Sequence, residues 1–203
     1  MYFPFRIPRQ FLLILFSALL YASSASAVEM AGVKIDDSMH VANQTLKLNG
    51  TGIRYKIFFK VYVASLYLPD NRTTTPEVLA LPGAKRLNLV VLRDLGSEEL
   101  GQRFIDGIKK NLDMAERARL VDSMLAFGQM FAQIPDLKKG DSLNVDWVPG
   151  IGAVGQYNGK PLGGAIKDLN FYNALLKIWI GDHAVDEKLK QALLSGKAPA
   201  TAN

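Results

Sequence analysis

The chain has 203 residues, with 24 Lys and Arg against 19 Asp and Glu, a formal net charge of +5, and no cysteine. The missing thiols exclude disulfides, cysteine nucleophiles and zinc–thiolate sites, so a hydrophobic core must stabilise the fold. The basic residues form no dense cluster interleaved with aromatic residues, and this argues against nucleic-acid binding.

The first residues have the pattern of a secretory signal peptide. Arg6 and Arg9 precede an apolar run at 11–21, and Ala25-Ser26-Ala27 forms an A-x-A cleavage site. A membrane anchor is the poorer interpretation, because the run is shorter than the ~20 residues of a spanning helix and no later segment qualifies. We expect cleavage after Ala27 and export to a bacterial periplasm.

The mature chain, residues 28–203, would carry a net charge of +3, since Arg6 and Arg9 leave with the signal peptide. We expect one domain at 28–195, followed by a disordered tail at 196–203. The sequence does not define an oligomeric state.

Strand signals dominate the first part of the mature chain. Asn49-Gly50 is a strong turn pair, and Pro69 ends a long run rich in Ile, Phe, Val and Tyr. We expect, in chain order, strand and turn at 32–41, strands at 45–48 and 53–68, a short helix at 75–81 and a strand at 85–92.

The second part begins with two helices. Ser97 is the expected N-cap of the first, with Glu98 and Glu99 in its first turn, where the helix dipole favours negative charge. Its apolar stripe is Leu100, Phe104, Ile108 and Leu112; the inner side of the second helix, at 114–133, is Val121, Met124, Leu125, Gly128 and Phe131. A strand at 142–148 follows, then a strand at 153–160 that turns through Asn158-Gly159, a helix at 169–180 that Gly181 ends, and a helix at 186–194. Strands and helices thus occur in blocks, which predicts an α+β fold: a mostly antiparallel sheet with helices on one face.

Several possible sites are better explained by structure. Gly150–Gly155 matches G-x-G-x-x-G, but strand and turn residues follow where a dinucleotide site needs a helix, so we expect hairpin turn and bulge glycines. His40 and His183 lack neighbours with metal-ligand or triad spacing, and exposed or capping roles are expected. Asp36-Asp37 fits turn chemistry. No metal site and no cofactor are predicted.

The run at 53–68 has two unlike faces when it is read as one strand. One alternates through Ile53, Tyr55 and Ile57 to Tyr67 and is nearly all apolar, whereas the other is cationic first, at Arg54, Lys56 and Lys60, and then apolar. Either a ligand cleft or a half-solvated sheet gives this pattern. In a straight strand Arg54 and Tyr62 lie ~26 Å apart at ~3.3 Å per residue, so they meet only if the chain bends. We expect Lys56 and Lys60 to be solvated, and Tyr55 and Tyr67 to pack.

Four segments together resemble the chalcone isomerase fold family, most closely its bacterial secreted chalcone isomerase-like branch. They are LNGTGIRYKIFFKVYVASLYLP, RDLGSEEL, DWVPGIGAVGQYNGKPLGG and FYNALLKIWIGDHAVDEKLKQALL, and the likeness covers about residues 30–195. The resemblance implies an open-faced β-sandwich, in which a large antiparallel sheet carries a layer of helices and a ligand cleft lies between them.

The resemblance also suggests site residues. Plant members cyclise a chalcone to a flavanone; their strand arginine corresponds to Arg54 through GIR, and their strand threonine to Tyr62, counted back from LYL. The helix positions that carry Tyr, Lys and Asn in those enzymes correspond to Leu100, Arg103 and Gly107, which removes two of the three polar groups. Other members bind fatty acids through an arginine and a tyrosine, without catalysis.

We therefore expect a non-catalytic binder of a fatty acid or a similar amphipathic small acid, with Arg54, Tyr62, Arg103 and Leu100 as ligand-binding residues. The alternative is an intramolecular lyase that acts on a chalcone-like conjugated carbonyl compound. In that case Arg54 would stabilise the anion and Tyr62 would orient the substrate or a water molecule.

Overall fold

The computed structural model describes residues 27–196, so residues 1–26 of the predicted signal peptide and residues 197–203 of the predicted tail lie outside the described residues. Seven strands form one sheet in the order β3-β4-β5-β6-β7-β8-β9, and every neighbouring pair is antiparallel. The predicted α+β class is confirmed. The strands are β3 (Ser38–Val41), β4 (Gln44–Lys56), β5 (Phe59–Leu68), β6 (Lys85–Val91), β7 (Ser142–Val148), β8 (Gly152–Tyr157) and β9 (Lys160–Ile166).

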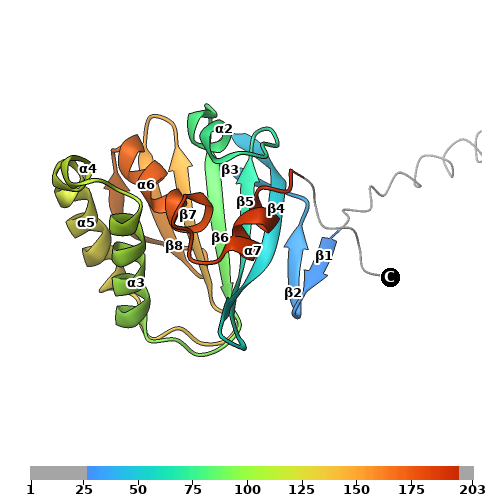
Figure 1. The fold of residues 1–203 in the computed structure, drawn as a ribbon. Helices are drawn as coiled ribbons and strands as arrows, with labels where there is room; N and C mark the ends of the chain where they lie inside the picture. Colours follow the sequence, from blue (N-terminus) through green and yellow to red (C-terminus); the bar gives the residue numbers. More distant parts are fainter. Residues whose placement is uncertain (1–26, 197–203) are drawn as a thin grey trace, which may run out of the picture.

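Helices cover one face of this sheet (Figure 1). The central one is α6 (Leu169–Ile180), whose Phe171, Trp179 and Ile180 are fully buried, because apolar residues follow one another on almost all sides of it. The others are α2 (Thr75–Ala80), α3 (Ser97–Lys110), α4 (Met114–Arg119), α5 (Val121–Phe131) and α7 (Glu187–Leu193). Within residues 27–196, no helix has the length and apolar character needed to cross a bilayer.

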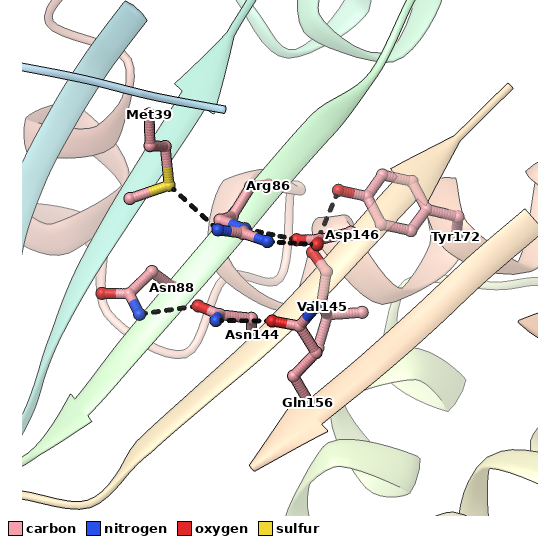
Figure 2. Close-up of polar contacts among 8 residues, drawn as sticks. All are labelled: Met39, Arg86, Asn88, Asn144, Val145, Asp146, Gln156 and Tyr172. Atoms are coloured by element: carbon pink, nitrogen blue, oxygen red, sulfur yellow. Dashed lines mark hydrogen bonds and ion pairs between the residues drawn. The ribbon is translucent and has the colours of Figure 1, made fainter. Parts of the chain in front are cut away.

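The opposite face of the sheet combines a small apolar cluster with polar rows. A hairpin of β1 (Ala27–Met30) and β2 (Val33–Asp36) contributes Ile35 to the cluster, in which Leu48 and Tyr67 are also buried. Beside it Arg86 forms a two-point ion pair with Asp146, at 2.6 and 2.5 Å (Figure 2). Amide side chains of Asn88, Asn144 and Gln156, which occupy one register row on β6, β7 and β8, hydrogen bond in series.

The predicted strand at 53–68 is wrong, because this run is a hairpin. Strand β4 ends at Lys56, Ile57 and Phe58 form the turn, and β5 starts at Phe59. A bulge leaves Val61 as an extra residue, since Tyr55 pairs with Lys60 and Arg54 with Tyr62. The bend that the sequence required to bring Arg54 and Tyr62 together is therefore present, but the bulge breaks the simple parity pattern of two faces.

The predicted turn at Asn49-Gly50 is also wrong, because both residues lie inside β4 at a bulge. Gly50 lies against α7, where a Cβ would collide with the carbonyl oxygen of Ala192. The buried Asn49 side chain donates to the carbonyl oxygen of Leu193 at 2.7 Å and accepts from Arg72 N at 2.7 Å. The pair that resembled a hairpin turn is the contact site of the last helix.

Two predictions about the central helices need correction. Ser97 is the first residue of α3 and Gly96 is its N-cap, without a side-chain cap. The helix expected at 114–133 is broken at Leu120, whose backbone (φ −100°, ψ 7°) is not helical. After this break, the side of α5 that faces the core carries Phe127 and Met130. Because of this break, Val121 and Leu125, expected inside, are 55% and 63% exposed.

The later elements agree closely with the sequence. The strand at Ser142–Val148 and the helix at Leu169–Ile180, with Gly181 as C-cap, are confirmed to the residue. Gly150 lies in the β7–β8 turn and Gly155 in β8, as expected for a hairpin. The expected turn at Asn158-Gly159 is confirmed, since β8 ends at Tyr157 and β9 begins at Lys160. The sequence did not predict β9 as a strand, and this edge strand accommodates Gly163 and Gly164.

Candidate functional site

A cleft of about 480 Å³ lies where the β4–β5 hairpin meets the helical layer. Both hairpin strands, the loop before α3 and one side of α3 form its walls. The connection between α6 and α7, which includes His183 and Val185, completes them. The volume falls within the ~300–1,000 Å³ that is typical of small-molecule sites. Residues distant in sequence therefore form one concave surface.

Arg54 lies on the helix-facing side of β4, directly opposite Tyr62 on β5. Its Nη1 is 3.4 Å from Oδ2 of Asp186, and the two side chains are only 24% and 15% exposed. Asp186 is at the same time the N-cap of α7, where its Oδ1 accepts from Leu189 N at 3.1 Å, and its Oδ2 accepts from Tyr55 N at 3.3 Å. The aspartate thus fixes the guanidinium against the helix start, and within residues 27–196 it is the only hydrogen-bond partner of the Arg54 side chain.

Tyr62 is buried at the back of the cleft, and its hydroxyl accepts a hydrogen bond from Nε1 of Trp179 at 2.9 Å. Within the described part of the chain, Trp179 is its only hydrogen-bond partner. Burial raises the pKa of Tyr62 to about 12, although the Trp179 hydrogen bond and Arg54 act in the opposite direction. The phenol is therefore neutral near pH 7, and its proton is free to be donated.

Cations predominate at the rim of the cleft. The lining includes five Lys and Arg residues against three Asp and Glu residues. Arg103 donates from Nε and Nη2 to Glu99 Oε1, at 3.0 and 2.6 Å, and Lys56 lies 3.9 Å from the same oxygen. The hydrogen bond from Arg103 lowers the pKa of Glu99, so this carboxylate stays ionised and partly neutralises the rim.

The inner walls are apolar. Leu100 and Phe104 project from the buried stripe of α3, one turn apart, and Val61 reaches the cleft from the β5 bulge. The Phe104 ring packs edge-on against Trp179, with 5.0 Å between ring centroids. The Arg54 guanidinium and the neutral Tyr62 phenol therefore lie in the same cleft as a hydrocarbon surface.

The structure places all four sequence-predicted site residues, Arg54, Tyr62, Leu100 and Arg103, in the lining of this one cleft. Their roles toward a ligand remain predictions. Arg103 differs from Arg54 because it is 57% exposed and paired along its own helix.

Sequence reasoning missed Trp179 and Asp186, which hold Tyr62 and Arg54 in place. Both come from the last fifth of the chain, more than 110 positions from their partners. The sequence predicted a helix from residue 186, but no local pattern indicates that Asp186 caps it and also pairs with Arg54.

Three further expectations can be compared with the structure. Lys56 is exposed, as expected, yet it contributes to the cleft rim, and Tyr55, expected to pack, is 41% exposed. His183 lies at the cleft edge, with its backbone N–H and C=O bonded to the Asn111 side chain, and exposed His40 contacts Thr45. Among residues 27–196, no group of three or more His, Cys, Asp or Glu side chains is placed to hold a metal ion.

Comparisons with known proteins agree with the fold. A family model described as chalcone isomerase-like matches residues 27–195. The crystal structure of a fatty-acid binding protein from Arabidopsis thaliana superposes with a TM-score of 0.68 at 15% sequence identity, covering 83% of this chain and 96% of that one. At this identity the likeness establishes the fold alone. A search of curated proteins gives no match.

Proposed function

Within the chalcone isomerase-like family, to which this chain belongs, we propose that the protein is a non-catalytic binder of a fatty acid or a similar amphipathic small acid. The ligand carboxylate is held by Arg54 and Tyr62, and the alkyl chain lies along Leu100 and Phe104. One observation carries the proposal: the guanidinium of Arg54 and the neutral phenol of Tyr62 lie opposite each other in a cleft whose inner walls are apolar.

The chemistry of the two groups suits a carboxylate. A guanidinium donates charge-assisted hydrogen bonds to carboxylate oxygens, and an un-ionised phenol adds a donor without adding negative charge. The Tyr62 oxygen accepts a hydrogen bond from Trp179, so the proton of the Tyr62 hydroxyl can point into the cleft. The similar fold of a plant fatty-acid binding protein supports this choice of ligand.

The rival function, an isomerase or intramolecular lyase, has weaker support. Such an enzyme stabilises developing negative charge with several fixed donors. Across the cleft from Arg54, the α3 positions Leu100 and Gly107 supply no polar side chain, and Arg103 is engaged by Glu99. An Arg54-dependent cyclisation of a chalcone, followed by absorbance, would reverse this preference.

The test is direct. Freshly purified protein is examined by native mass spectrometry for a co-purifying acid, and delipidated protein is titrated with dodecanoate by calorimetry. We expect one dodecanoate per chain and no binding of dodecanol at matched concentration. Absence of a saturable dodecanoate site would refute the proposal. We further propose export to the periplasm, for which N-terminal sequencing of the cell-fractionated protein should give Val28 as the first residue.

A further inference from the structure

The tip of the β4–β5 hairpin is an exposed apolar projection. Ile57, Phe58 and Phe59 are 78%, 90% and 59% exposed, and they are consecutive in the chain. Isolated apolar residues on a surface are ordinary, but three adjacent ones at the end of a hairpin indicate a contact surface. The hairpin extends beyond the helical layer at the lower end of the sheet in Figure 1.

Local folding does not explain these residues. Ile57 is the first residue of the two-residue turn and has φ +59°. Glycine, asparagine and aspartate are the residues that such a turn favours, and a β-branched side chain at positive φ is a genuine outlier. The chain thus places a bulky apolar residue where the turn itself would select a small or polar one.

The residues beside the tip are cationic and aromatic. Exposed Lys56 and Lys60 flank it, Tyr55 is 41% exposed, and the guanidinium of Arg93 lies 5.0 Å from the centroid of the Phe59 ring. The segment from Arg54 to Lys60 contains no acidic residue, and Glu99 of α3 lies 3.9 Å from Lys56. An apolar end surrounded by Lys, Arg and Tyr is complementary to a bilayer surface that carries anionic headgroups above hydrocarbon.

We propose that the β4–β5 tip inserts Ile57, Phe58 and Phe59 into the interface of a membrane that contains anionic lipid, with Lys56 and Lys60 at the headgroups. A narrow tip of three side chains fits a fluid interface better than a folded partner, since stable protein interfaces take about 800 Å² from each side. Lys56 and Arg93 also line the cleft, so docking would bring its mouth to the surface where amphipathic acids partition. The proposal of membrane docking depends only on the residues of the tip, whereas the access of amphipathic acids to the cleft rests on the proposed function.

The experiment uses residues 28–203, because an apolar leader would itself bind vesicles. The chain is sedimented with phosphatidylcholine vesicles that contain 30% phosphatidylglycerol, and with pure phosphatidylcholine vesicles. Binding is expected to the first set, at least tenfold weaker to the second, and reduced by salt. An Ile57→Gly/Phe58→Ser variant relaxes the turn while it removes the apolar groups, and it should bind at least tenfold more weakly. Leu125→Ser, which removes a 63% exposed leucine from α5, is the matched control and should change binding less than twofold.

A second readout places the tip itself. Tryptophan at position 58, introduced as Phe58→Trp, should shift its emission to the blue on anionic vesicles and be quenched by brominated acyl chains. No vesicle binding by the parent chain, equal binding by the double variant, or self-association that the double variant abolishes would overturn the proposal. Titration of the double variant with dodecanoate in solution separates the two functions. If dodecanoate fails to bind the parent chain while vesicles still do, only the ligand proposal falls.

Discussion

Replacement of Arg54 by methionine isolates the proposed carboxylate contact. Methionine keeps an unbranched stem of similar reach but has no charge, so the wall of the cleft stays filled. A hydrogen bond to a charged group contributes about 1.5–3 kcal/mol, which corresponds to a 10- to 150-fold loss of affinity for dodecanoate. We expect the upper half of this range, because Asp186, only 15% exposed, would lose its cationic partner and face the incoming carboxylate.

Isothermal titration calorimetry with delipidated protein measures this effect, and thermal unfolding followed by circular dichroism verifies that Arg54→Met is folded. Arg103→Met is the matched control, since this guanidinium is 57% exposed and paired with Glu99. Exposed ion pairs contribute at most about 1 kcal/mol, so the affinity of Arg103→Met for dodecanoate should fall no more than about fivefold. If folded Arg54→Met binds dodecanoate within twofold of the parent chain, Arg54 does not hold the carboxylate and the reasoning from its position is wrong.

Three other predictions concern the residues that support the fold and the cleft. Tyr62→Phe should cost about 1–3 kcal/mol of stability by leaving the buried Trp179 N–H unpaired. Between pH 10 and 12 the unfolded chain loses the Tyr62 proton, whereas the folded chain, in which the pKa of Tyr62 is about 12, keeps it. Tyr62 therefore lowers the free energy of unfolding by about 1.4 kcal/mol per pH unit in this range, and Tyr62→Phe should remove that contribution. Urea unfolding at several pH values measures both effects. Arg86→Met should destabilise the protein by about 3–5 kcal/mol, because Asp146 is buried and burial already raises its pKa, whereas Arg86→Met/Asp146→Leu should recover most of the loss in the same assay. Gly50→Ala should lower the melting temperature by displacing the last helix, and an unchanged value would contradict the close contact seen at that glycine.

Local sequence patterns determined the fold class, the bounds of several elements and two residues of the cleft. Block order gave the α+β class, and the apolar stripe on α3 follows from side chains four positions apart. Strand β7 and helix α6 were predicted to the residue, and Gly181 marked the end of α6. The resemblance in the G-x-R and L-Y-L segments led to Arg54 and Tyr62, and both line the cleft.

Tertiary contacts decided the rest. Asn49-Gly50 carries the same turn signal as Asn158-Gly159, yet α7 packs against Asn49-Gly50 and the pair is part of a strand. Ile57 and Phe58 carry no turn signal, and they turn because pairing Arg54 with Tyr62 extends both strands of the sheet. The partners that fix those two side chains, Asp186 and Trp179, come from the other end of the chain. A local pattern records which face of an element is apolar, whereas the neighbour that covers the face depends on contacts between distant segments, and only the folded chain supplies those.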